Sequence, residues 1–245
     1  MQDDLGTMLD VPSRVRRVVS IVPSLTEAIA TTHASLLVGA TDWCTHPADL
    51  DVTRVRGTKN PDVDLIRELA PDIVIANEEE NRAADLDALR GAGLVVWVTA
   101  PTTVEQSLNS LQRLLGAVVG EVPEWLTQAR EVWRTPYAGP RRRALIPIWR
   151  RPWMALGRDT FAGDLLQRIG VDNVLAESPE RYPRIELAGV PEYDLVVLPD
   201  EPYAFSPEDG PEAFDRPACN VSGRHLTWYG PSLVQARALL TEQLA

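Results

Sequence analysis

Short apolar runs alternate with amphipathic stretches along the first hundred residues. Turn residues bound these runs, and we predict buried strands at residues 18–22, 36–40, 72–76 and 94–98. Helical patterns lie between them at residues 62–69, which stop before Pro71, and at 82–90, which Gly91 or Gly93 closes. Ser24 and Glu27 have the spacing of a capping box, so a further helix is expected to begin at Ser24. This alternation predicts a parallel sheet with helices on both faces.

The pattern changes after residue 101. Apolar residues recur at spacings of 4, 3, 4 and 3 and predict one face of an amphipathic helix, at Val104, Leu108, Leu111, Leu115 and Val118. Pro123 can open a second helical stretch that runs to about Trp133. The αβ alternation then restarts, with strands predicted at residues 144–149, 173–175 and 193–198 and helices at 160–169 and 231–244.

The fold class that follows is α/β, with two Rossmann-like αβ lobes bridged by a long helical connector. We assign residues 1–101 to the first lobe, 102–140 to the connector and 141–245 to the second lobe. Residues 68–75 are echoed by 186–188 and 194–197, which favours a duplication, although any two parallel strands share such a composition. Ligands of open α/β sheets collect beyond the carboxyl ends of the strands, so a cleft between the lobes is expected.

Tryptophan is the notable residue of the predicted strand ends. The chain has seven, and four fall at strand ends or in loops, namely Trp43, Trp149, Trp153 and Trp228. Broad aromatic side chains suit a large, flat, partly apolar ligand. The alternative is that these side chains seal the lobe surfaces.

Composition narrows the function classes. The formal net charge of −11 argues against binding to nucleic acid or to anionic membranes. No apolar run is long enough to span a bilayer. The acidic start has no signal-peptide core, so the expected location is the cytoplasm, or an extracytoplasmic one if a leader was trimmed. Cys44 and Cys219 are expected as reduced thiols, with one long-range disulfide as the alternative.

Enzyme motifs are missing. The chain has no G-x-S-x-G elbow around Ser24 and no G-x-G-x-x-G dinucleotide motif. Its acidic residues offer many acid–base pairs but single out none. We therefore expect a protein without catalytic residues and without a resident cofactor.

Four segments carry a resemblance to a known family, namely VVSIVPSLTE (18–27), TDWCTHP (41–47), GTKNPD (57–62) and PDIVIANEEENR (71–82). They resemble the helical-backbone (class III) substrate-binding proteins of ABC importers, in particular the cobalamin-binding branch. The resemblance covers about residues 14–245 and is strongest in the first lobe. It implies ligand capture in the cleft, for uptake or for handling inside the cell, and no catalysis.

The resemblance also implies a ligand and partners. The ligand expected is a corrinoid of the cobalamin type, and the alternative is a ferric-siderophore, heme or metal-ion receptor of the same fold. The expected ligand-binding residues are Ser24, Trp43, Asn77, Glu78, Arg82, Trp149, Trp153, Tyr203 and Trp228. An ABC permease is the implied protein partner, and the residues expected to dock on it are Glu79, Glu80 and Glu201. A solvated acidic loop is the alternative for these three.

A metal site is a weaker alternative. Asp42, Cys44 and His46 lie on one short loop, where alternate side chains share a face and suit a soft transition metal. The competing interpretation is a buried Cys44 and a hydrogen-bonded His46, and a variant has His46 bind the cobalt of a corrinoid. Arg82 and the Arg150–Arg151 pair can hold anionic groups of a ligand, or can be exposed loop charges.

Overall fold

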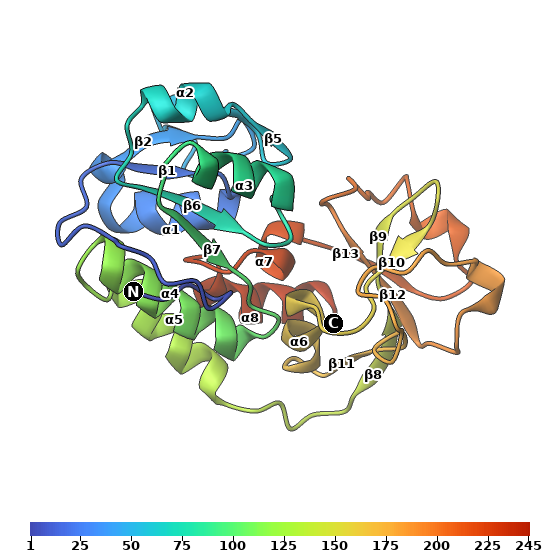
Figure 1. The fold of residues 1–245 in the computed structure, drawn as a ribbon. Coiled ribbons are helices and arrows are strands. Elements are labelled where there is room, and N and C mark those ends of the chain that lie inside the picture. The colour runs from blue at the N-terminus through green and yellow to red at the C-terminus, as the bar shows by residue number, and fades with distance from the viewer. The chain divides into compact units, whose positions relative to one another are not determined.

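The computed structural model describes residues 1–245 and contains two compact units. The first unit consists of residues 1–101, 107–127 and 229–231, and the second of residues 102–106, 128–228 and 232–245. Each unit has a parallel sheet of its own, which confirms the predicted α/β fold class (Figure 1). The predicted connector contains helices α4 (Val104–Val118) and α5 (Glu124–Arg134). Each of these helices has some residues in the first unit and the others in the second.

The sheet of the first unit has the strand order β3-β2-β1-β6-β7 and only parallel pairs. Its strands are β1 (Val18–Ser20), β2 (Leu37–Ala40), β3 (Thr53–Arg54), β6 (Ile73–Asn77) and β7 (Val96–Thr99). A small antiparallel pair, β4 (Arg56–Gly57) with β5 (Asn60–Pro61), follows β3. The helical segments of the unit, besides parts of α4 and α5, are α1 (Pro23–His33), η1 (Ala34–Leu36), α2 (Val63–Glu68) and α3 (Ala83–Gly91).

Local signals explain where these helices begin. Asp62 caps α2, because its carboxylate accepts a hydrogen bond from the Leu65 amide at 3.1 Å. The capping box expected at Ser24 is wrong, because α1 begins with Pro23 at its first turn and Val22 is the N-cap residue. Proline suits that place because it needs no hydrogen-bond partner for a backbone N–H.

The core of the first unit lies where α2 and α3 cover one face of the sheet (Figure 1). Ile66 of α2 and Leu89 of α3 pack against strand residues such as Val74 and Val98, and all four side chains are fully buried. The five apolar positions that predicted α4 are buried as well. Burial of this kind stabilises the unit by about 25 cal/mol per Å² of apolar surface removed from water.

The second unit repeats the order of four of the five strands in the sheet of the first unit. Its sheet runs β11-β8-β12-β13, again with parallel pairs only. The strands are β8 (Arg142–Leu145), β11 (Val171–Asn173), β12 (Leu195–Pro199) and β13 (Ala218–Val221). The second strand in the chain, β11, lies at one edge of this sheet, and the first, third and fourth strands follow it across the sheet. The first unit has the same arrangement in β2-β1-β6-β7, with β3 added beside β2. This repeated order is what the duplication hypothesis expects.

The remaining elements of the second unit frame its loops. An antiparallel hairpin of β9 (Pro147–Trp149) and β10 (Met154–Ala155) follows β8. The helical segments are α6 (Phe161–Gln167), η2 (Leu187–Gly189), η3 (Pro211–Ala213), α7 (Gly223–Thr227) and α8 (Leu233–Gln243). The strand predicted at residues 144–149 covers the end of β8 and the whole of β9, whereas β10, β13 and α7 were not predicted, because each is short and lacks a clear period.

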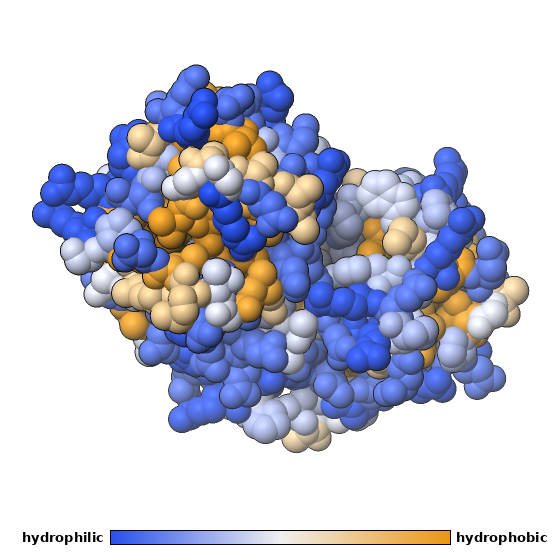
Figure 2. Space-filling view, in the orientation of Figure 1, coloured by the Kyte–Doolittle hydropathy of each residue, from blue (hydrophilic) through white to orange (hydrophobic).

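Hydrophilic residues cover most of the face in Figure 2, with hydrophobic areas on each unit. None of the helices has the length and the apolar character needed to span a membrane.

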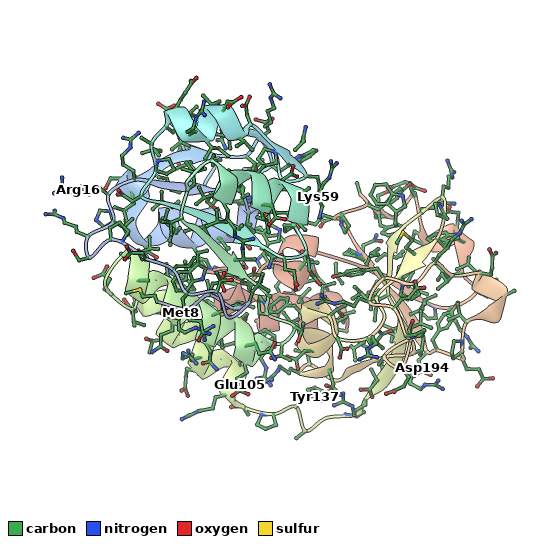
Figure 3. All side chains as sticks on the ribbon, in the orientation of Figure 1. Met8, Arg16, Lys59, Glu105, Tyr137 and Asp194 are labelled. Atoms are coloured by element: carbon green, nitrogen blue, oxygen red, sulfur yellow. The ribbon has the colours of Figure 1, made fainter.

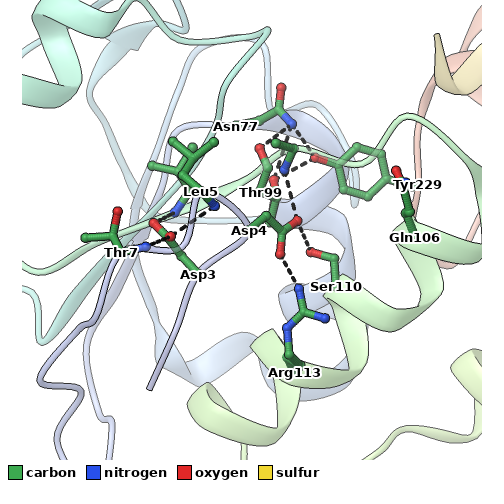
Figure 4. Close-up of polar contacts among 12 residues, drawn as sticks. Asp3, Asp4, Leu5, Thr7, Asn77, Thr99, Gln106, Ser110, Arg113 and Tyr229 are labelled. Carbon is green, nitrogen blue, oxygen red and sulfur yellow. Dashed lines mark hydrogen bonds and ion pairs between the residues drawn. The ribbon is translucent and has the colours of Figure 1, made fainter. Parts of the chain in front are cut away.

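The first residues of the chain are tied to the first unit by Asp4 (Figure 4). Its carboxylate accepts hydrogen bonds from the Ala100 amide at 2.9 Å and the Ser110 hydroxyl at 2.6 Å. It also pairs with the Arg113 guanidinium at 2.5 Å, although the Asp4 side chain is only 9% exposed. Asp4 therefore joins the N-terminal segment to β7 and α4 through largely buried polar contacts.

Replacing Asp4 by alanine is expected to lower the free energy of unfolding by about 1–3 kcal/mol, because buried donors lose a charged acceptor. Urea unfolding followed by far-UV circular dichroism measures this. Asp10→Ala is the matched control, because Asp10 is exposed. Equal stability of the two variants would contradict the role of Asp4.

Candidate ligand-binding surfaces

Trp43 is the most exposed tryptophan at a strand end in the first unit. It lies in the loop after β2, and 67% of its surface is exposed. Arg54 of β3 holds this loop, because its guanidinium donates to the backbone carbonyls of Thr41 (3.1 Å), Cys44 (2.9 Å) and Leu50 (3.0 Å). The loop thus presents a broad aromatic side chain to solvent on a fixed backbone.

Cys44 faces the interior of the same loop. Its Sγ lies 3.1 Å from each of the hydroxyls of Thr26 and Thr41, and the side chain is fully buried. Burial raises the pKa of the Cys44 thiol, so the thiol stays protonated at neutral pH. Cys44 is a free thiol, and so is Cys219 of the second unit.

The three residues weighed as metal ligands point to different surroundings. Asp42 is exposed, Cys44 is buried, and His46 Nδ1 lies 3.2 Å from the Thr45 hydroxyl. No group of three or more His, Cys, Asp or Glu side chains in the chain is arranged to hold a metal ion.

Asn77, at the end of β6, is at the centre of a buried polar network (Figure 4). Its Nδ2 donates to the Tyr229 hydroxyl at 2.7 Å and to the Thr99 carbonyl at 2.9 Å. Its Oδ1 accepts from the amides of Glu79 and Glu80 at 2.9 and 3.1 Å. Both polar atoms of Asn77 are therefore engaged within the first unit, where they shape the loop after β6.

That loop carries the acidic run predicted at the edge of the sheet. Glu78 and Glu80 are exposed, and Glu79 is half-buried. Lys59, the sole lysine of the chain, donates to the Glu79 carbonyl oxygen (Figure 3). Arg82 is exposed just before α3, whereas Ser24 is buried in the first turn of α1.

In the second unit, three of the predicted contact residues come together. Trp149 and Tyr203 meet edge to face with ring centroids 5.6 Å apart. Tyr203 lies 4.6 Å from Phe205, on which Trp153 stacks at 6.0 Å. We call Trp149, Trp153 and Tyr203 the aromatic cluster. Phe205 is buried against β12, so the cluster has a rigid base, while Trp149 remains 42% exposed.

Arg150 lies within the aromatic cluster but is not an available cation. Its guanidinium sits 5.3 Å from the centroid of the Trp153 ring, and the side chain is 15% exposed. It pairs with Asp209, and with Glu212 at 2.5 Å. Asp209 also accepts a hydrogen bond from the Tyr203 hydroxyl at 2.6 Å, which lowers the pKa of the Asp209 carboxyl and raises that of the Tyr203 phenol.

Trp228 and Glu201 belong to a separate part of the second unit. The Arg224 guanidinium lies 5.8 Å from the centroid of the Trp228 ring, and Trp228 ends α7. Glu201 is half-buried and accepts a weak hydrogen bond from the Thr227 hydroxyl at 3.4 Å.

Sequence reasoning missed several residues that organise these surfaces, namely Arg54, Asp209, Glu212, Phe205 and Tyr229. Tyr229 follows Trp228 in the chain, but nothing local indicates that its hydroxyl reaches Asn77, 152 residues away. Asp209 and Glu212 lie in a loop rich in acidic residues, where the sequence does not reveal which of them meet Arg150.

Comparisons with known proteins agree with this architecture. No protein-family model matches the chain. The vitamin B12-binding protein of Yersinia pestis (strain Pestoides F) is 26% identical over 192 residues, which is 74% of this chain and 68% of that protein. The match is long enough to include both units.

Solved structures share the fold. The periplasmic vitamin B12-binding protein BtuF of Vibrio cholerae has a TM-score of 0.74 at 17% identity, over 95% of this chain and 98% of that one. The periplasmic heme-binding protein RhuT from Roseiflexus sp. RS-1 has 0.71 at 20%, over 94% and 97%. Helicobacter pylori CeuE with Ni(II) bound has 0.82 at 13%, over 99% and 87%.

These findings confirm the resemblance to the helical-backbone (class III) substrate-binding proteins of ABC importers. The chain is thus similar in sequence and fold to proteins that are named as binding proteins. Two of the three solved neighbours are periplasmic, so the comparisons do not support the expected cytoplasmic location.

Arg54→Ala is expected to loosen the loop that carries Trp43, because three backbone carbonyls lose their donor. Amide hydrogen exchange of residues 42–50 should become at least about tenfold faster, as loss of about 1.4 kcal/mol of local stability implies. Mass spectrometry of peptides from this loop measures the rates. Arg67→Ala on α2 is the control, since Arg67 makes only an exposed ion pair with Asp64. Unchanged exchange in Arg54→Ala would contradict this role.

Tyr229 gives a pH-dependent contribution to stability. Burial raises the pKa of its phenol well above the ordinary value of about 10. Above that pH the unfolded chain loses a proton that the folded chain keeps, so the free energy of unfolding falls as pH rises. Tyr229→Phe should reduce this fall, at a cost of about 1 kcal/mol at neutral pH from the lost hydrogen bonds.

Absorbance at 295 nm measures the ionisation directly. The folded protein is expected to ionise at least one tyrosine fewer than the unfolded chain between about pH 10 and 11, and Tyr229→Phe should reduce the difference by one. Ionisation of all five tyrosines in the folded protein would contradict the burial of Tyr229.

Proposed function

We propose that the chain captures a corrinoid of the cobalamin type without chemical conversion. The observation that carries this proposal is the aromatic cluster, in which Trp153 and Tyr203 pack on Phe205, Trp149 packs on Tyr203, and Arg150 is paired with two carboxylates. A corrin ring is large and flat and carries peripheral amides, so it can lie against such rings without needing a positive charge. The similarity to vitamin B12-binding proteins points the same way.

Apolar contact supplies the driving force in this proposal. Each Å² of apolar surface that leaves water contributes about 25 cal/mol, less the cost of ordering the ligand and any polar groups left imperfectly paired. Trp43 of the first unit adds a second exposed aromatic side chain. Trp228 is half-buried and completes the proposed aromatic contacts.

Polar contacts to the ligand's amides are assigned to Glu78 and Arg82, because both side chains are exposed after β6. Asn77 and Ser24 are buried, and we propose that they support the neighbouring loops. No resident cofactor is part of this proposal, because the corrinoid is the cargo.

Delivery to an ABC permease is the partner role that we propose, outside the cytoplasm, as the periplasmic neighbours suggest. Glu79, Glu80 and Glu201 are the proposed docking residues. Their carboxylates suit arginine side chains of a permease, since bidentate Arg–carboxylate pairs combine charge with geometry.

The second candidate is a receptor for heme or for another anionic metal chelate, such as a ferric siderophore. Neighbours named as heme-binding and nickel-bound favour it, and so do the exposed Arg82 and Arg151. The neutralised Arg150 disfavours it, because a ligand with carboxylates gains nothing from a guanidinium that is already paired twice.

Tryptophan fluorescence tests the proposal. Titration with cyanocobalamin is expected to quench emission with saturation, and Trp149→Ala and Trp43→Ala should each weaken binding by about tenfold or more, as expected for central aromatic contacts. Trp125→Phe is the control, because the Trp125 indole donates to Thr32 at 3.1 Å within the first unit. Saturable binding of hemin but not of cyanocobalamin would instead support the second candidate.

A further inference from the structure

We propose that Asp209 and Glu212 are specificity-determining residues: by neutralising Arg150 they make the aromatic cluster select uncharged flat ligands against ligands that carry carboxylates. This inference rests on the proposed function, because it concerns the ligand that the cluster holds.

Arg150 is placed where a carboxylate receptor would need a cation. It directly follows Trp149, its guanidinium covers the Trp153 ring at 5.3 Å, and its side chain is largely buried at 15% exposure. A guanidinium next to an aromatic surface binds carboxylates with two parallel hydrogen bonds when its donors are free. Here the donors are directed to Asp209 and Glu212 instead.

Both acids are fixed by contacts other than Arg150. The Tyr203 hydroxyl donates to Asp209 Oδ2 at 2.6 Å, and the Gly210 amide donates to Glu212 Oε2 at 2.6 Å. These hydrogen bonds are the leading causes that lower the pKa of each carboxyl, so both are ionised at neutral pH. The acids therefore remain beside Arg150 with or without a ligand.

The charges of the three side chains do not cancel by themselves. Arg150 contributes +1 and the two acids contribute −2, and the neighbouring Arg151, whose charge also acts on Asp209 and Tyr203, brings the local charge to zero. A carboxylate on a ligand that lies against the rings therefore finds no net attraction and no free donor on Arg150. An amide in the same place needs no positive charge, and its N–H groups can donate to the acids.

A matched pair of corrinoids isolates charge from shape. Cyanocobalamin and its derivative with one propionamide hydrolysed to a carboxylic acid differ by one negative charge. The wild-type protein is expected to bind the amide form more tightly, by about threefold to tenfold, as one or two partly exposed charge contacts imply. Asp209→Asn with Glu212→Gln removes two negative charges beside Arg150 and should abolish or reverse this preference.

Two further variants complete the test. Arg150→Gln removes one positive charge beside the two acids and should increase the preference for the amide form. Glu177→Gln with Glu242→Gln is the matched control, because it makes the same change in net charge at exposed positions of the second unit, and it should keep the wild-type preference. Near-ultraviolet circular dichroism reports whether each variant keeps its aromatic packing. If the double variant loses this packing, Glu212→Gln alone takes its place in the test.

The outcomes separate this inference from the proposed function. If the wild type binds cyanocobalamin but Asp209→Asn with Glu212→Gln leaves the preference unchanged, the inference is wrong and the proposed function stands. If no corrinoid binds, the proposed function fails, and hemin with its dimethyl ester serves as the matched pair. If the double variant binds hemin more tightly relative to the dimethyl ester than the wild type does, the inference is supported. If this ratio of affinities is unchanged, or if neither ligand binds, the inference is overturned.

Discussion

Parallel strand pairing is the constraint on which the rest of this structure depends. Because all strands of each main sheet run in one direction, the loops that follow β1, β2, β6 and β7 gather at one edge of the first sheet. The second sheet repeats this with the order β11-β8-β12-β13. Trp43 and Glu78 of the first unit, and Tyr203 of the second, follow strands and owe their places to this rule. Hydrophobic burial along the strands holds the scaffold, so the loops are free to carry ligand contacts.

The two units prepare their loops by different means. In the first, polar groups are satisfied internally: Asn77 binds Tyr229 and the loop amides, and Arg54 binds three carbonyls. Such contacts fix the backbone and leave Trp43 exposed. In the second, aromatic rings rest on a buried phenylalanine, and an ion pair triad of one arginine and two carboxylates borders them. Fixed loops reduce the ordering cost of binding, which is the general advantage of preorganised sites.

The candidate site residues were predicted from their place relative to a strand. Trp149, Trp153 and Tyr203 follow strands, and the structure brings them together in one cluster. Asn77 also follows a strand, but both of its polar atoms are engaged within the first unit. The sequence could not distinguish the two cases, because the partner that engages Asn77 is Tyr229, far along the chain. Cys44 was likewise open between a ligand and a buried thiol until its surroundings were known.

By itself the sequence determined the α/β class, the helices of residues 104–118 and 124–134, most of the sheet strands and the resemblance to substrate-binding proteins. These depend on periodicity and short motifs, which are local properties. Only the tertiary structure decided that Arg150 is neutralised, that Arg54 holds the Trp43 loop and that Tyr229 closes the end of β6. Each of these depends on which side chains meet across long stretches of chain, and no local pattern encodes such a meeting.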